Sequence, residues 1–307
     1  MKRYLIKVFV IGIIILTVLA SMEFYVRSIP NEYSYKCQYL DKHIDSIQML
    51  AVGSSVGRSG IDPESFDGFA FNAANVSQDL ETDCAIIDKY LPKAKQLNTV
   101  IFTLLPGSYC SRMGEGIEYW RLRKYDIYMK LNIEKPSFFD RFEISEPNKV
   151  FLQILKGVRG ANTIGCFEKG MGCDTIVESE AAKLSQGIKI SKIHNEGYRP
   201  DNYPIITTRL RETIKKCDAS GIKVLLVLLP SYYTYYDRIN QKMLSECDSI
   251  SKELASSYAN VFYYNMFKDS SYTTEDFRNS NHLSPKGANK LCIKLNEIIN
   301  GLGKIIL

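Results

Sequence analysis

Residues 46–60 read SIQMLAVGSSVGRSG, an apolar run that ends at Gly53 and is followed by small residues and a serine pair. Such a run is typical of a strand buried on both faces. Similar runs occur at 69–71, 98–105, 222–229 and 261–264, and helical patterns at 78–91, 209–219, 240–258 and 285–300. Because apolar strands alternate with helices, we predict an α/β fold, a doubly wound parallel sheet of about five strands.

The domain organisation follows from the spacing of these elements. Residues 107–202 separate the third strand from the fourth, a stretch of about 95 residues that is far too long for a plain connection. We predict a helical insertion there, with helices at 119–131 and 136–156. The α/β domain would then comprise residues 26–106 and 203–307, with residues 27–39 as a connector.

The N-terminal segment is apolar. Residues 8–22 carry no charge, and Lys2, Arg3 and Lys7 precede them. With residues 4–6 the stretch approaches the length of a membrane span, so residues 1–25 are expected to form a single-pass anchor. The positive residues place the N-terminus in the cytoplasm and the C-terminal domain outside it. The alternative is a signal peptide cleaved near Ala20, which would release a secreted protein.

Composition narrows the class of protein further. The 307 residues carry a net charge of +5, and three of the positive charges belong to the N-terminal segment. Because the rest of the chain has nearly equal numbers of positive and negative residues, the composition argues against a nucleic-acid partner. Of the eight cysteines, Cys166 and Cys173 could form a disulfide in an oxidising compartment, and Cys84, Cys217, Cys247 and Cys292 are expected as buried thiols in helices. With no CxxC pair and no histidine-rich cluster, we expect no metal site and no cofactor.

The loop after the first strand is the first place to look for chemistry, since functional groups gather at the carboxyl ends of parallel strands. Its spacing does not fit a phosphate-binding loop, because Arg58 and Ser59 stand where that motif needs glycine and lysine. Ser55 would instead lie on a sharp strand-to-helix turn, a position suited to a nucleophile. Gly-Ser-Ser is also common in loops without a function.

A serine nucleophile needs a base, and the chain has three histidines. His43 lies in a polar segment before the first strand and is expected at the surface. His194 lies in a polar run late in the insertion and is expected in a loop. His282 directly precedes the last helix, where it would reach the same edge of the sheet as Ser55. It is therefore the candidate base, with helix capping as the alternative role.

These motifs resemble those of the SGNH/GDSL hydrolase superfamily. The resemblance covers about residues 46–105 and 205–300 and leaves the insertion unexplained. It rests on Gly53-Ser54-Ser55 after the first strand, Asn72-Ala73-Ala74-Asn75 after the second, and Asn279-Ser280-Asn281-His282 before the last helix. It implies that Ser55 is the nucleophile, that His282 is the base, and that the Ala74 backbone N–H or the Asn75 amide supplies an oxyanion donor.

The chain departs from the family pattern at two places. The loop after the third strand, Leu105-Pro106-Gly107-Ser108, lacks the family's asparagine donor. The acid of the family's Asp-x-x-His block is replaced by Asn279, which cannot stabilise an imidazolium by charge. Asp276 lies three residues earlier and could substitute for it. Otherwise the site would be a Ser-His dyad or an inactive one.

An anchored member of this superfamily resembles proteins that transfer acyl groups onto cell-envelope polymers, such as alginate or teichoic acids, beside a membrane-bound O-acyltransferase. The resemblance implies an acyl ester or envelope polysaccharide as substrate. Aromatic residues could stack on sugars or serve as packing, namely Tyr119, Trp120, Tyr232, Tyr233, Tyr235 and Tyr236. Arg121, Arg123 and Lys124 are expected on a solvated helix face, or against lipid headgroups or an acidic glycan. The alternative function is a non-catalytic envelope-binding or scaffolding protein, which the asparagine at position 279 favours.

Overall fold

The computed structural model describes residues 1–131, 133 and 137–303. Its sheet has five parallel strands in the order β2-β1-β3-β4-β5. The strands are β1 (Met49–Gly53), β2 (Ala70–Asn72), β3 (Thr99–Leu104), β4 (Lys223–Leu228) and β5 (Val261–Asn265). Each lies within one of the predicted apolar runs or differs from it by one residue at an end. The predicted α/β class is therefore confirmed.

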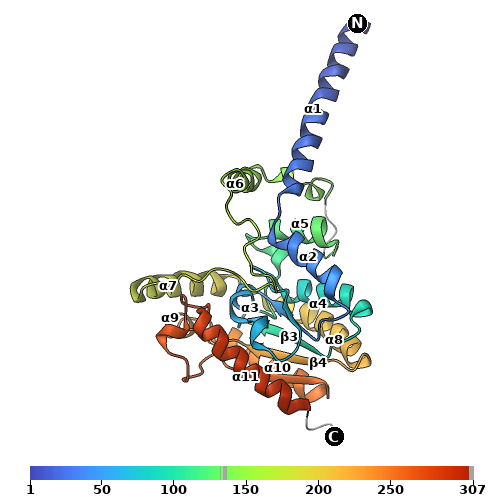
Figure 1. Ribbon diagram of the computed structural model, residues 1–307. Helices are drawn as coiled ribbons and strands as arrows, with labels where there is room; N and C mark the ends of the chain where they lie inside the picture. The colour runs from blue at the N-terminus through green and yellow to red at the C-terminus, as the bar shows by residue number, and fades with distance from the viewer. Residues whose placement is uncertain (132, 134–136, 304–307) are drawn as a thin grey trace.

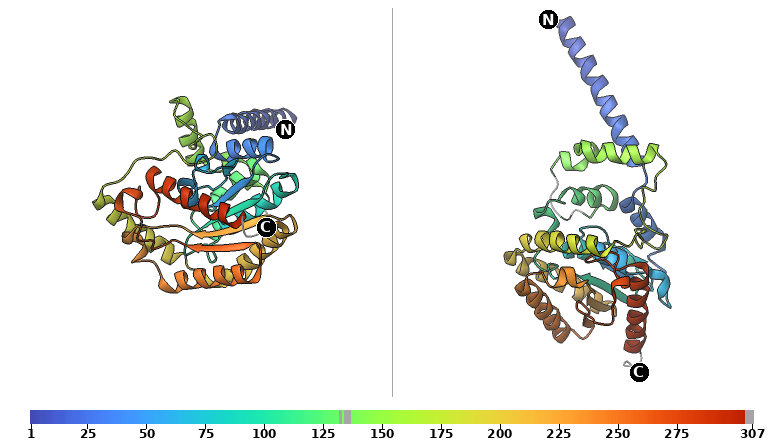
Figure 2. Two further views of the ribbon diagram at one scale, coloured as in Figure 1. Left: turned by 60° about the horizontal axis from the view of Figure 1, so that its bottom comes forward. Right: turned by 90° about the vertical axis from the view of Figure 1, so that its left-hand side faces the viewer.

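Helices cover both faces of the sheet (Figures 1 and 2). The longer ones are α1 (Lys2–Ser28), α2 (Glu32–His43), α4 (Leu80–Tyr90), α6 (Pro147–Val158), α7 (Glu180–Glu196), α8 (Tyr203–Ala219), α10 (Gln241–Ser257) and α11 (Pro285–Gly303). The shorter ones are α3 (Ser55–Gly60), α5 (Trp120–Lys124) and α9 (Tyr233–Tyr236). Single turns are η1 (Pro63–Ser65), η2 (Leu91–Lys93), η3 (Met113–Glu115), η4 (Tyr125–Met129), η5 (Phe139–Arg141), η6 (Glu143–Ser145), η7 (Pro200–Asn202) and η8 (Thr274–Asp276).

The core has two layers, because alternate strand residues point to opposite faces of the sheet. Leu50 and Phe102 belong to the layer that includes residues of α2, α4, α8 and α10. Ala51 and Ile101 belong to the layer that includes residues of α3 and α11. All of these strand residues are almost completely buried. This arrangement fixes the carboxyl ends of β1 and β2 side by side, where the candidate site lies.

Helix α1 projects from the rest of the molecule (Figure 1). It is long and apolar enough to cross a membrane or to serve as a signal sequence, and its most apolar stretch is fully exposed. Its last turns are different, because Glu23 and Val26 are buried. Residues 27–39, predicted as a connector, are instead the end of α1 and the first part of α2.

The insertion is mainly helical in its described part. The predicted helix 119–131 corresponds to α5 followed directly by the π-helical turn η4. The predicted helix 136–156 begins at a residue that lies outside the described ones, and in its place the structure has η5, η6 and α6. Helix α7 was not predicted. All eight cysteines are free, including Cys166 and Cys173, and Cys84, Cys217, Cys247 and Cys292 are buried thiols.

Candidate active site

Ser55 is the first residue of α3, directly after β1. The turn depends on glycine at two positions. Gly53 has a φ of +136°, and a Cβ there would lie 1.9 Å from Thr103 Oγ1. A Cβ at Gly57 would lie 2.0 Å from the same atom. The glycines that make this loop look like a phosphate-binding motif are thus required by the close approach of α3 to β3, and they hold Ser55 at the carboxyl edge of the sheet.

Three side chains form a chain of hydrogen bonds at this edge. His282 Nε2 lies 2.9 Å from Ser55 Oγ. His282 Nδ1 lies 2.9 Å from Asn279 Oδ1. Both Ser55 and His282 are only partly buried, so a substrate can reach them. The serine, histidine and asparagine that the sequence singles out are therefore brought together, although 227 positions separate Ser55 from His282.

The surroundings of Asn279 define the tautomer of His282. Asn279 Oδ1 also accepts the backbone N–H of His282 at 3.0 Å and of Asn281 at 3.3 Å. The atom facing the imidazole is therefore the amide oxygen, an acceptor, and His282 Nδ1 must carry its proton. His282 Nε2 is left with a lone pair that can accept the Ser55 hydroxyl proton. This is the tautomer that a general base requires.

The pKa of His282 is lowered from 6.5 to about 3. The main cause is burial, which removes water from around the charged form, and the positive charges of Arg278 and Arg58 act in the same direction. Asp174 opposes the shift, but its carboxylate pairs with Arg58 at 2.7 Å. The imidazole is therefore neutral at physiological pH and free to accept a proton, but its protonated form gains little stabilisation.

Asp276 is not the partner of His282, which corrects the prediction that it could replace the missing acid. Its Oδ2 accepts the backbone N–H of Thr273 at 2.9 Å and pairs with Lys290 at 3.2 Å. An isolated antiparallel bridge between Phe277 and Leu283 closes a short loop after it. Asn279 lies within that loop, where its side chain reaches His282 Nδ1.

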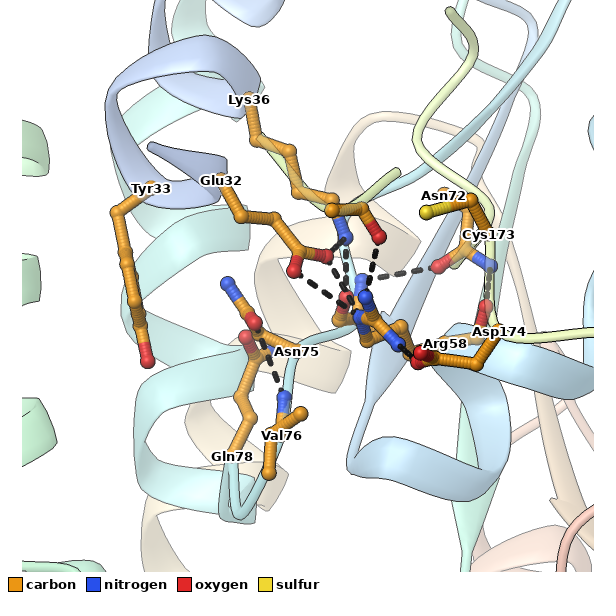
Figure 3. Close-up of polar contacts among 12 residues, drawn as sticks. Glu32, Tyr33, Lys36, Arg58, Asn72, Asn75, Val76, Gln78, Cys173 and Asp174 are labelled. Atoms are coloured by element: carbon orange, nitrogen blue, oxygen red, sulfur yellow. Dashed lines mark hydrogen bonds and ion pairs between the residues drawn. The ribbon is translucent and has the colours of Figure 1, made fainter. Parts of the chain in front are cut away.

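The two candidate oxyanion donors differ. Ala74 N–H donates to Asn72 Oδ1 at 3.0 Å, so it is occupied, and the prediction that it serves as a donor is wrong for this arrangement. Asn75 N–H donates to Gly53 O at 3.0 Å, which places Asn75 beside the turn that carries Ser55. Its side-chain Oδ1 accepts from Val76 N, and Nδ2 points away from Val76 (Figure 3).

The Asn75 amide nitrogen is buried and, among the described residues, has no hydrogen-bond partner. An unpaired buried donor is costly, and a catalytic role is one reason for a protein to keep such a group. Asn75 Nδ2 is therefore the better candidate for binding an oxyanion.

An Asn75→Ala variant should lower kcat for ester hydrolysis by about 10²–10³-fold, because one preorganised donor to the transition state is lost. The variant loses only the part-buried hydrogen bond from Val76 N–H to Asn75 Oδ1, since Nδ2 makes none in the described structure, so the protein should still fold. Initial rates with a chromogenic acetyl ester measure this effect, and thermal denaturation checks the fold. Wild-type kcat in a folded Asn75→Ala variant would remove Asn75 from the site.

An ionic cluster around Arg58 was not predicted (Figure 3). Arg58, three residues after Ser55, is 6% exposed and pairs with Glu32 of α2 at 2.8 Å. It also pairs with Asp174 and donates to Gly165 O, both in the insertion. Lys36, completely buried, pairs with Glu32 and donates to Ala74 O. The cluster thus joins α2, α3, the loop after β2 and the insertion.

Asn72, at the end of β2, has a structural role that was not predicted. Its Nδ2 donates to Gly57 O at 3.0 Å and to Ile61 O at 2.7 Å, at the end of α3. Its Oδ1 accepts Ala74 N–H. It therefore fixes α3 against β2, whereas the ionic cluster fixes α3 against α2 and the insertion. The signal that could have found it is a polar residue inside a buried strand.

His194 is not in a loop but in α7, and its Nδ1 lies 2.7 Å from Tyr235 Oη. Burial lowers its pKa to about 4. His194 therefore stays neutral in the folded protein while an unfolded chain binds a proton below about pH 6.5, so stability falls as pH drops towards 4.

A His194→Gln variant should lose less stability between pH 7 and pH 5 than the wild type does, by about 1–2 kcal/mol. Urea unfolding of the detergent-solubilised full chain, followed by circular dichroism, measures this difference. A His43→Gln variant controls for the loss of a histidine elsewhere. Parallel losses in the wild type and His194→Gln would contradict the assignment.

The aromatic and basic residues that were considered for ligand contacts differ in exposure. Tyr119 and Tyr233 are exposed, whereas Tyr235 is completely buried and cannot stack on a ligand. Arg123 and Lys124 are not on a solvated face. They are buried and pair with acidic residues of the next turns, Asp140 at 3.0 Å and Glu143 at 2.5 Å. Arg121 pairs with Glu118 and donates to Tyr33 Oη.

No protein-family model matches the chain, and no curated protein matches it. Similar solved structures include a proposed platelet activating factor from Streptococcus pneumonia, with 13% identity and a TM-score of 0.38 over 91% of this chain and 97% of that one. A proposed lipolytic protein of the G-D-S-L family from Desulfitobacterium hafniense has 12% identity and a TM-score of 0.39, over 80% and 95%. A proposed acylhydrolase from Bacteroides fragilis has 9% identity and a TM-score of 0.39, over 92% and 96%. At these values the functional conclusion must come from the site itself.

Proposed function

We propose that this protein is an acyl esterase or O-acyltransferase of the SGNH type, with Ser55 as nucleophile and His282 as base. The observation that carries the proposal is the hydrogen-bonded chain from Ser55 through His282 to Asn279. The tautomer that Asn279 imposes leaves His282 Nε2 able to accept a proton. The unpaired Asn75 amide supports it further, since acyl transfer needs a donor for the developing oxyanion.

In the proposed reaction, Ser55 Oγ attacks the acyl carbonyl carbon and its proton passes to His282 Nε2. The resulting oxyanion is bound by the Asn75 amide and by the Ser55 N–H, which has no partner within α3 because it lies in the first turn. The tetrahedral intermediate collapses, the imidazolium protonates the leaving alcohol, and the acyl group remains on Ser55. Neutral His282 then takes a proton from water or a sugar hydroxyl as that oxygen attacks the acyl carbon. It passes this proton to Ser55 Oγ as the acyl–Ser55 bond breaks, which releases the carboxylic acid or the acylated sugar.

The proposal extends to location and substrate. Helix α1 would anchor the chain with its N-terminus in the cytoplasm, as Lys2, Arg3 and Lys7 indicate, and the catalytic domain would act outside the cytoplasm on a cell-envelope polysaccharide. A membrane-bound O-acyltransferase is the proposed partner that supplies the acyl group. Exposed Tyr119 and Tyr233 offer stacking faces for sugar rings.

The test is an acyl-transfer assay on the full-length protein in lipid vesicles. A chromogenic acetyl ester is supplied with and without a soluble envelope glycan, and both the released chromophore and the acetylated glycan are measured. An esterase releases chromophore alone, and a transferase also acetylates the glycan. A folded protein that neither releases chromophore nor forms acetylated glycan would contradict the proposal. It would favour the alternative, a non-catalytic envelope-binding or scaffolding protein, for which Asn279 in place of an acid is the supporting observation.

A further inference from the structure

Helix α6 has two apolar faces, and only one of them is covered. Val150 is buried, and a Cβ at Gly157 would be in van der Waals contact with Ile29. Phe151 and Val158, on the other side, are 64% and 72% exposed. A surface helix of a soluble domain normally buries its apolar stripe and leaves polar residues outside. The second face of α6 therefore needs an occupant.

The turn η5 adds to the same exposed surface. Phe138 and Phe139 are both about 70% exposed. Large aromatic side chains of soluble domains are seldom exposed to this extent. Five exposed side chains of α6, of η5 and of the residue before η5 are called the α6 patch below; they are Phe138, Phe139, Phe151, Leu152 and Val158. Large exposed apolar side chains gathered within one short segment are typical of a contact with a protein or a membrane.

The α6 patch is fixed to the base of α1. Glu23 of α1 accepts the backbone N–H groups of Glu143 at 3.0 Å and Ile144 at 3.1 Å, in η6. Arg27 donates to Arg141 O at 2.7 Å, and Gln153 of α6 donates to Val26 O at 3.4 Å. Figure 1 and the right-hand view of Figure 2 show α6 lying across the lower end of α1, between α1 and the sheet.

The position of Glu23 sets the level of the bilayer surface. Residues 4–22 of α1 would span about 28 Å at 1.5 Å per residue, close to the thickness of a hydrocarbon core. Glu23 is the first acidic residue of the chain, so the hydrocarbon must end at about this point. Because η6 binds Glu23 directly, η5 and α6 lie at the same depth as the headgroups. With α1 as an anchor, the lipid around α1 would meet the α6 patch at this depth.

We infer that the α6 patch is a second membrane contact, inserted into the bilayer interface beside α1. The inference rests on the proposed role of α1 as an anchor. Helices that lie in the interface have apolar residues on one side and lysine or arginine beside them. Lys149, Lys156 and Arg159 supply that charge here, which suits anionic lipid headgroups.

A contact at two points has a consequence for the catalytic domain. A single helix lets a domain tilt and turn, whereas α1 and the α6 patch together fix the domain against the bilayer. Buried pairs transmit this constraint, since Lys124 of α5 binds Glu143 of η6. The site would then be held in one orientation above the membrane, where an acyl donor would be delivered.

The single tryptophan of the chain makes the contact measurable. In a Trp120→Phe background, a Phe151→Trp substitution places the only indole on α6. The full-length protein is reconstituted into vesicles of phosphatidylcholine and phosphatidylglycerol, with or without brominated acyl chains, and fluorescence is recorded. An indole in the interface should be quenched at least about two-fold more than one in water.

Two matched variants in the same background separate the possible outcomes. Leu16→Trp reports whether α1 is in the bilayer, and Ile293→Trp lies on α11, away from α1. Quenching of Leu16→Trp and Phe151→Trp, but not of Ile293→Trp, is the expected result. Quenching of Leu16→Trp alone would overturn the α6 contact, leave the anchor intact and indicate a protein partner for the patch. With neither Leu16→Trp nor Phe151→Trp quenched, both the anchor and the contact would be wrong.

Discussion

A Ser55→Ala variant should lose ester hydrolysis by at least about 10³-fold, because removing the nucleophile leaves only binding and oxyanion stabilisation. The fold should persist, since Ser55 is partly exposed and its Oγ bonds only to His282 among the described residues. The measurement is kcat/KM for a chromogenic acetyl ester with the full-length protein in detergent.

The matched control is Ser59→Ala, one turn later on the same helix. It makes the same change of serine to alanine in α3 but does not touch the imidazole. The expected result is near wild-type hydrolysis for Ser59→Ala and none above background for Ser55→Ala. Equal rates in the two folded variants would show that any hydrolysis arises elsewhere.

An Asn279→Asp variant should raise kcat by about 10²–10⁴-fold, because a carboxylate would stabilise the imidazolium formed when Ser55 is deprotonated. The distance of 2.9 Å between His282 Nδ1 and Asn279 Oδ1 already suits such a bond. The carboxylate should also raise the pKa of His282 from about 3. The acid limb of the pH–rate profile should therefore move to higher pH in the variant, since the base becomes protonated sooner.

The control for this gain is the double variant Asn279→Asp with Ser55→Ala. If the higher kcat of Asn279→Asp depends on Ser55, it should be lost in the double variant. Unchanged kcat and an unchanged acid limb in a folded Asn279→Asp variant would contradict the assignment of Asn279 as the partner of His282.

Sequence reasoning located the strands because their residues are apolar on both faces, as in residues 98–105 and 222–229. It also located Ser55 and His282, because both lie directly beside predicted elements at one edge of the sheet. It missed α2, whose buried stripe includes Lys36, a charge that interrupts the apolar pattern and is tolerated only because Glu32 pairs with it.

Helix α7 was missed for a related reason. Its buried residues are Lys183, Gly187 and Ser191, four apart, so its inward face is polar or small. A helical stripe of this kind carries no hydrophobic signal, and His194 was consequently expected in a loop. The choice between Asn279 and Asp276 likewise depended on the bridge between Phe277 and Leu283, a long-range feature that local spacing does not reveal.

The central claim is that His282 activates Ser55 as a nucleophile, and covalent labelling tests it most directly. The full-length protein is incubated with a serine-reactive phosphonate, and the adduct is located by peptide mass spectrometry. We predict one adduct per chain, on Ser55, lost in His282→Ala and kept in Ser59→Ala. A folded wild-type protein that remains unlabelled at Ser55, or labels equally well without His282, would contradict the account.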